Sequence, residues 1–158
     1  MSSPNDALPE PADTPAGPEP RARVQAALDT LTGRLRAAGS AGWQRIDLMA
    51  RMAGDAAELE VHETRADGST GPAPVDEPPL LELLRELRDA EYEPENGAWF
   101  SLRLFVPADG DWWLAENRVW EPAWRVPPAD ETYREDLDRY PREDTAVPPW
   151  LAAKVPSA

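Results

Sequence analysis

The chain has 158 residues, of which 30 are Asp or Glu and 16 are Lys or Arg, giving a formal net charge of −14. A surface of this sign repels phosphate backbones and anionic lipid headgroups, which argues against nucleic-acid and membrane partners. The absence of cysteine excludes disulfides and thiolate metal sites. The charge would attract and steer a cationic protein partner, or it could serve solubility alone.

Residues 1–19 are rich in proline and acidic side chains and offer little to bury. We therefore expect a disordered tail there, followed by a single α+β domain over residues 20–155. The N-terminus lacks the basic and apolar regions of a secretory signal, and no stretch of about 18 apolar residues occurs. These features predict a cytoplasmic protein, with export by a route that needs no N-terminal signal left open.

The first half of the domain has the pattern of a helix followed by a β-hairpin. Residues 20–38 carry apolar side chains at spacings of three and four, which predicts an amphipathic helix that Gly39 ends in the left-handed conformation. Residues 43–52 and 57–63 alternate apolar and polar side chains on either side of a turn, which predicts two strands with one buried face. The outward positions of the second strand include His62.

A loop rich in turn-forming residues spans 66–79 and leads to a second helix over 79–90. The leucines of this helix share one stripe. Its charged side chains are expected to face water: Glu82, Arg85, Glu86 and Arg88.

A second hairpin follows. Residues 98–106 alternate, with Phe100 on one face and Trp99 on the other, and residues 112–119 return as the partner strand after a turn at 107–111. Because both faces of this hairpin carry large side chains, one face should meet the helices and the other should be covered or offered to a partner.

The C-terminal third is expected to be irregular over 120–129 and helical over 130–139, with Asp130 as the N-cap and Thr132 as the alternative. Trp150 and Leu151 should dock back onto the body. The element order α-β-β-α-β-β-α predicts an α+β fold in which helices pack against an antiparallel sheet of two β-hairpins.

Residues able to carry chemistry are few. His62 is the only histidine and lies on the outer face of its strand, and no glycine-rich phosphate loop follows a strand. The acidic residues Glu135, Asp136 and Asp138 alternate with arginines on one helix, a pattern typical of a solvated face. We therefore predict no catalytic residue, no cofactor and no metal ion.

The residue pattern instead favours a protein-binding surface. Five of the seven tryptophans lie between Trp99 and Trp124, and large aromatics surrounded by charges are typical of the centre of an interface. The alternative is that Trp120, Trp124 and Trp150 hold the irregular C-terminal segment onto the sheet. Trp113 and Glu116 lie on opposite faces of one strand, so only one of them can face the core. The predicted partner-binding residues are Trp112, Trp113, Glu116, Trp120, Trp124, Glu131, Glu135 and Asp138.

Two stretches of the C-terminal half, AWFSLRLFVPADGDWWLAENRVWEPAW and ETYREDLDRYPREDTAVPPWL, resemble the YezG-like immunity proteins of bacterial polymorphic toxin systems. The resemblance covers residues 97–151 and extends to the N-terminal half in pattern only. It departs from the family where the return strand begins with two tryptophans. The motif residues are Tyr133, Asp136-Leu137, Tyr140-Pro141-Arg142, Pro149 and Trp150-Leu151.

The resemblance implies an antitoxin that is made beside a secreted toxin, such as a nuclease or an NAD-degrading enzyme, and blocks its active site. Two other functions stay open at this point. One is a non-inhibitory adaptor or secretion chaperone that uses the same surface, and the other is an enzyme that uses carboxylates on a small molecule.

Overall fold

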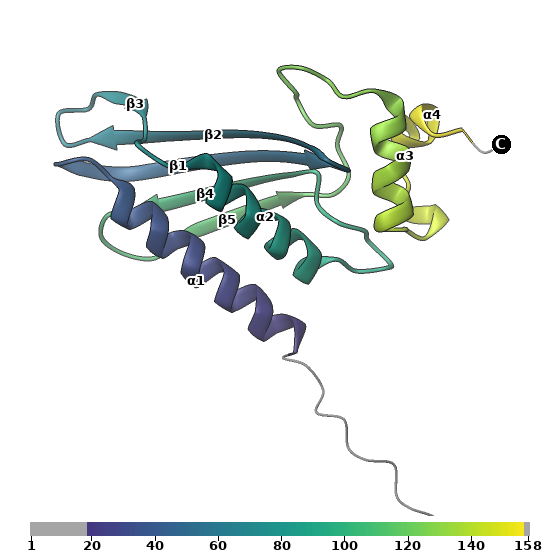
Figure 1. Ribbon diagram of the computed structural model, residues 1–158, viewed down its shortest axis with the longest axis horizontal. Coiled ribbons are helices and arrows are strands. Elements are labelled where there is room, and N and C mark those ends of the chain that lie inside the picture. The colour runs from purple at the N-terminus through teal and green to yellow at the C-terminus, as the bar shows by residue number, and fades with distance from the viewer. Residues whose placement is uncertain (1–18, 157–158) are drawn as a thin grey trace, which may run out of the picture.

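A five-stranded antiparallel sheet in the order β3-β2-β1-β4-β5 forms the centre of the computed structural model, which describes residues 19–156 (Figure 1). The strands are β1 (Trp43–Ala53), β2 (Ala56–Arg65), β3 (Thr70–Pro72), β4 (Ser101–Pro107) and β5 (Trp113–Asn117). The α+β class is confirmed, and the order α-β-β-α-β-β-α is confirmed in outline. The structure adds the short strand β3 inside the loop expected at 66–79 and, after the last predicted helix, a 3-10 turn at Asp144–Ala146 and a helix at Pro149–Lys154.

Two helices cover one face of the sheet, and two shorter helices lie beyond one of its ends (Figure 1). The helices on the face are α1 (Pro20–Ala38) and α2 (Glu77–Glu91), and those at the end are α3 (Asp130–Arg139) and α4 (Pro149–Lys154). The tail expected at residues 1–19 lies almost wholly outside the described residues. Within residues 19–156 no helix has the length and apolar character needed to cross a membrane.

The main core lies between the sheet and the helices α1 and α2. The spacing of three and four in each helix places its leucines on the face that meets the sheet, while alternation along β1 and β4 supplies the opposing apolar layer. Each leucine moved from water into this layer stabilises the fold by about 1.5–3 kcal/mol. Its fully buried members include Leu31, Leu35, Ile46, Leu48, Leu84, Leu87, Leu102, Leu104 and Val106.

A second core attaches residues 118–156, the C-terminal arm, to the end of the sheet. Phe100, Tyr133 and Leu151 are buried there, and Trp124 and Trp150 pack against them. The three aromatic rings of Phe100, Tyr133 and Trp150 meet edge to face with centroids 5.3–6.2 Å apart, the geometry that the ring quadrupoles favour. The expected docking of Trp150 and Leu151 is confirmed.

A buried ion pair links α2 to α3 across this junction. The guanidinium of Arg88 donates to both carboxylate oxygens of Asp136 at 2.6 and 2.9 Å, and its Nε donates to the carbonyl of Trp99 at 2.7 Å. Arg88 is 3% exposed and Asp136 2% exposed. The expectations that Arg88 faces water and that Asp136 belongs to a solvated face are therefore wrong, because each charge has its counter-ion inside the protein.

Other local expectations are corrected as well. Gly39 has φ −53°, so it does not end α1 in the left-handed conformation. Glycine is needed there because a Cβ would collide with the indole of Trp43. Trp99 belongs to the main core and Phe100 to the second core, so their predicted faces are wrong. Asp130 is the first residue of α3 rather than its N-cap.

Candidate protein-binding surface

The sheet face opposite α1 and α2 is polar and internally paired. Arg51 on β1 lies 3.8 Å from Glu58 and 3.2 Å from Glu60 on the neighbouring strand β2. Asp47 on the same strand lies 2.9 Å from Arg45 and 3.6 Å from Arg103. Because these charges are matched across the strands, this face is held together by its own ion pairs.

The segment after β5 crosses the sheet to reach β2. The backbone N–H groups of Arg125 and Val126 donate to the carboxylate of Glu58 at 2.8 and 3.0 Å. Burial alone would raise the pKa of Glu58, but these two hydrogen bonds and the charges of Arg51 and Arg125 lower it. Glu58 therefore holds the crossing segment on the sheet as a charged acceptor.

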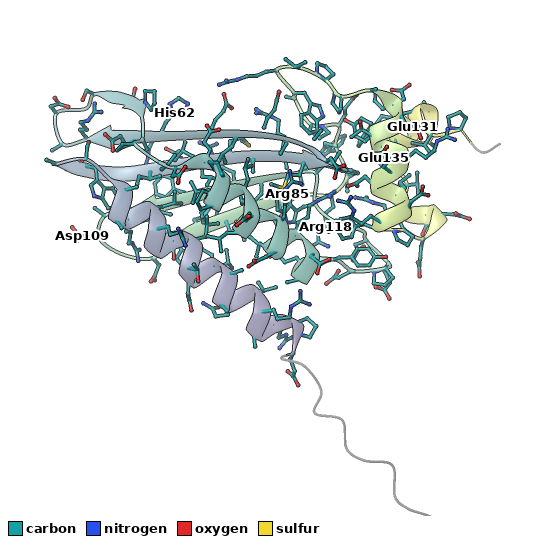
Figure 2. The ribbon with its side chains drawn as sticks, in the orientation of Figure 1. His62, Arg85, Asp109, Arg118, Glu131 and Glu135 are labelled. Atoms are coloured by element: carbon teal, nitrogen blue, oxygen red, sulfur yellow. The ribbon has the colours of Figure 1, made fainter. Side chains whose placement is uncertain are left out.

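His62 lies on the open face of β2, opposite Asp47 of β1, as the sequence predicted (Figure 2). The hollow at its side has a volume of about 290 Å³, and its charged lining residues are already paired with one another. Within residues 19–156 no group of three or more His, Cys, Asp or Glu side chains is arranged to hold a metal ion.

The most exposed aromatic side chains lie at opposite ends of β5. Trp113 begins the strand and is 56% exposed, and Trp120, three residues after its end, is 75% exposed. Trp113 pairs with Phe105 and so lies on the open face, whereas Glu116 pairs with Leu102 and lies on the helix side. The predicted separation of Trp113 and Glu116 onto opposite faces is confirmed.

Two other predicted tryptophans are partly buried. Trp112 packs against the main core, and Trp124 against the second core. The indole N–H of Trp124 donates to the hydroxyl of Tyr133 at 2.8 Å, and that of Trp150 donates to the carbonyl of Val119 at 2.7 Å. For Trp124 and Trp150 the structure thus supports the alternative reading, in which they hold the C-terminal arm in place.

The predicted acidic residues Glu131, Glu135 and Asp138 are exposed on α3 (Figure 2). Trp120 belongs to the same arm, and the next residue, Glu121, lies 3.3 Å from Lys154 of α4. The structure therefore places Trp120 in the C-terminal arm that also carries the exposed carboxylates of α3, and it leaves Trp113 at the far end of β5. The eight predicted residues do not form one continuous patch.

Glu116 belongs to a group of carboxylates that share one cation. The guanidinium of Arg118 lies 3.1 Å from Glu116 and 3.8 Å from Glu93, and it donates to the carbonyl of Glu91 at 3.1 Å. Burial, with the hydrogen bond and charge of Glu116, raises the pKa of Glu91 to about 8. The Glu91 carboxyl, which accepts from the indole N–H of Trp99 at 2.9 Å, is therefore largely protonated at neutral pH.

The residues that carry the family resemblance are mostly structural. Asp136 holds Arg88, Tyr133 and Trp150 build the second core, and Tyr140 lies 4.9 Å beneath the Arg88 guanidinium. Arg142 donates to the carbonyls of Arg118 and Ala98 at 2.6 and 2.7 Å. Burial lowers its pKa to about 10, which leaves it charged. Neither Arg118 nor Arg142 is among the predicted partner-binding residues, and Arg142 is named only as part of the family motif. Both fix the segments around Trp120.

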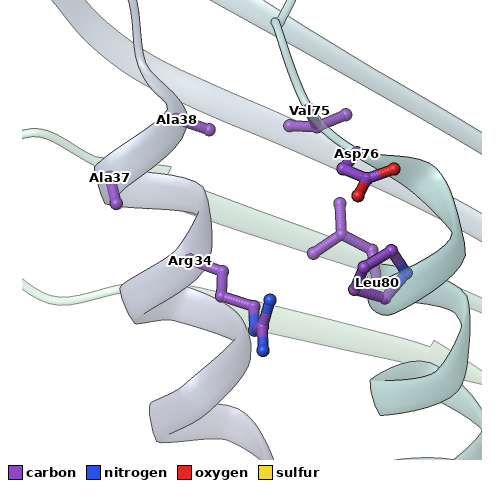
Figure 3. A pocket seen from close by; sticks show the side chains of 7 residues that line it. Arg34, Ala37, Ala38, Val75, Asp76 and Leu80 are labelled. Atoms are coloured by element: carbon purple, nitrogen blue, oxygen red, sulfur yellow. The ribbon is translucent and has the colours of Figure 1, made fainter.

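A separate hollow of about 300 Å³ lies between the end of α1 and the start of α2 (Figure 3). Its walls are mostly apolar and include Val75 and Leu80, with the charged groups of Arg34 and Asp76 at its side. Ligand sites place several polar groups around one point, and this hollow offers only that pair.

Comparison with protein-family models and with curated proteins gives no significant match to this chain.

Proposed function

We propose that the chain is an immunity protein that binds a cognate bacterial toxin and neutralises it in the cytoplasm of the producing cell. The observation that carries this proposal is the exposure of Trp113 and Trp120 on a strongly acidic protein. Both indoles remain in water, while most other large aromatic side chains pack into the two cores.

Indole side chains that stay exposed are more typical of a protein interface than of packing within the fold. Burying such a side chain in a partner's pocket is typical of residues whose truncation costs at least about 2 kcal/mol of binding free energy. Trp113 is opposite Phe105 in the ladder between β4 and β5, and Trp120 follows the exposed Val119. Each indole thus has an apolar neighbour that a partner could cover.

The charge of the chain indicates the kind of partner. Enzymes that cleave nucleic acids or NAD bind phosphates in basic clefts, and an acidic protein is attracted to such a cleft. The exposed carboxylates of α3 lie in the same arm as Trp120. A chain of this charge can therefore approach a basic partner quickly, while each exposed indole provides affinity after contact.

Co-expression tests this function. The product of the adjacent gene is expressed in a heterologous host, with and without this chain, and growth is measured. Protection by the chain supports the proposal, and loss of protection in the double variant Trp113→Ala/Trp120→Ala assigns it to the indoles. Val126→Ala is the matched control, because Val126 is 77% exposed but lies on the segment over β2.

Two results would reject the proposal. In the first, the adjacent gene product is not toxic or stays toxic beside the chain. In the second, the chain binds that product without protecting the host, which would favour the adaptor function.

A further inference from the structure

The outer edge of β5 carries backbone groups that the fold leaves free. Just after β4, the N–H of Ala108 donates to the carbonyl of Gln44 at 2.8 Å, and just before β4, the carbonyl of Phe100 accepts from the N–H of Met52 at 2.9 Å. The pairing is irregular at Phe100 itself, whose N–H donates to the carbonyl of Asn117 at 2.7 Å. In an antiparallel ladder the bonded positions alternate. The even-numbered residues of β4 therefore point their backbone groups at β1, and the odd-numbered residues point theirs at β5.

The register of β5 then fixes which of its groups face outward. Trp113, Ala115 and Asn117 are opposite odd-numbered residues of β4, so their backbone groups bond to that strand. By this alternation the N–H and C=O groups of Leu114 and Glu116 point away from β4, and within residues 19–156 no backbone hydrogen bond outside the ladders involves them.

The two edges of the sheet differ in how they are protected. At the other edge, β3 has only three residues and ends in Pro72, and its pairing with β2 includes Gly71. A short strand and a proline are both features that prevent another strand from adding to an edge. The residues of β5, WLAEN, include neither proline nor glycine, so this edge stays able to pair.

We propose that an extended basic segment of the partner protein adds to the edge of β5 as a sixth strand. This inference rests on the proposed function and names how the partner binds. Strand addition supplies affinity through the backbone groups of Leu114 and Glu116, and side chains supply specificity. On the open face the added strand passes Trp113, and on the helix face it passes Glu116.

The carboxylates near Glu116 indicate which kind of strand can add to the edge of β5. Two carboxylates at this end of β5, those of Glu93 and Glu116, share the guanidinium of Arg118. A Lys or Arg of the added strand beside Glu116 would supply the missing positive charge. A second copy of this chain would instead bring another net charge of −14 to the same edge, and like charges oppose such pairing.

Amide hydrogen exchange of the full chain, followed by NMR, tests the inference with a catalytically inactive form of the adjacent gene product as the probe. The amides of Leu114 and Glu116 should exchange rapidly in the free chain and at least about tenfold more slowly in the complex, because each gains an acceptor. The amide of Ala115, already directed at β4, is the internal control.

Substitution at the same position gives a second readout. Glu116→Pro removes the outward N–H without removing a bond to β4, and Glu116→Gln removes only the charge. The proline variant should bind the probe at least about tenfold more weakly than the glutamine variant, with both melting near the wild-type temperature. If the proline variant does not fold, the exchange measurement on the wild-type chain decides.

The outcomes separate this inference from the proposed function. Binding of the probe with unchanged exchange at Leu114 and Glu116 overturns strand addition and leaves the proposed function standing. Protection of these amides in the free chain, together with the mass of a dimer, overturns it in favour of a second copy. Failure of the wild-type chain to bind the probe rejects the proposed function, and the inference falls with it.

Discussion

Replacing Asp136 by alanine should detach the C-terminal arm from the sheet. Asp136 accepts two hydrogen bonds from Arg88 and one, at 2.7 Å, from the backbone N–H of Gly54. The variant leaves the Arg88 charge buried without its counter-ion, a change that costs about 3–5 kcal/mol. The unpaired N–H of Gly54 adds to this loss. Since domains have unfolding free energies of about 5–15 kcal/mol, a large part of the stability should be lost.

Urea unfolding measures this effect. With a slope of about 1–3 kcal/mol per molar urea, the transition midpoint should fall by at least about 1 M. Tryptophan fluorescence reports the arm through Trp124 and Trp150, and circular dichroism reports the whole fold. The double variant Arg88→Met/Asp136→Leu should recover most of the stability, because an apolar pair of similar volume has no charge to leave unpaired. A loss below about 1 kcal/mol in Asp136→Ala would refute the role given to this ion pair.

Two further predictions concern stability. Gly39→Ala should destabilise by about 1–3 kcal/mol, because its Cβ meets the Trp43 indole. Gly33→Ala, inside α1 with open space around it, should instead stabilise the protein by about 0.5–1 kcal/mol. Thermal unfolding of both variants measures these changes, and equal effects at the two glycines would contradict the prediction. Glu91 has its pKa raised from 4.5 to about 8 in the folded protein. Its contribution to stability is therefore complete below pH 4.5 and is lost as the pH rises towards 8. As the pH is raised from 5 to 8.5, the free energy of unfolding of Glu91→Gln should therefore increase relative to that of the wild type by on the order of 1–2 kcal/mol, a figure that allows for the partial exposure of Glu91. If the stabilities of the two proteins change in parallel with pH, the raised pKa is contradicted.

Much of the fold could be predicted because its helices and strands bury one face each. The spacing of apolar residues over 20–38 predicted where α1 begins and ends. Alternation along β1 and β4 predicted which residues of these strands share the face that meets the helices. Strand β3 could not be predicted in the same way. Its residues, Thr70–Pro72, are turn formers without alternation. They form a strand only because they pair with the edge of β2.

The positions of Arg88 and Asp136 on their helices indicated a buried ion pair, although the alternating charges around them suggested a solvated surface. Arg88 follows Leu84 by four positions on the apolar stripe of α2, and Asp136 follows Tyr133 by three on the stripe of α3. Two opposite charges, each on the buried stripe of its own helix, predict a partnered pair. Because both were interpreted only by their charge, both were expected to be exposed to solvent.

The predicted surface was resolved only in part. Sequence identified Trp113 and Trp120 as candidates, but it could not separate them from Trp124, because that difference depends on contacts between Trp124 and the distant Tyr133. It also could not reveal the free edge of β5, because strand order and the direction of each N–H follow from pairing across the sheet.

If the exposed indoles of this acidic chain bind a protein, their removal must weaken that binding. Calorimetric titration of the adjacent gene product with the wild-type chain, Trp113→Ala and Trp120→Ala measures this loss. We expect each substitution to weaken binding by at least about tenfold, in line with interface tryptophans, and to leave the melting temperature nearly unchanged. Unchanged affinity in both variants, or a large fall in melting temperature without a loss of affinity, would contradict the account.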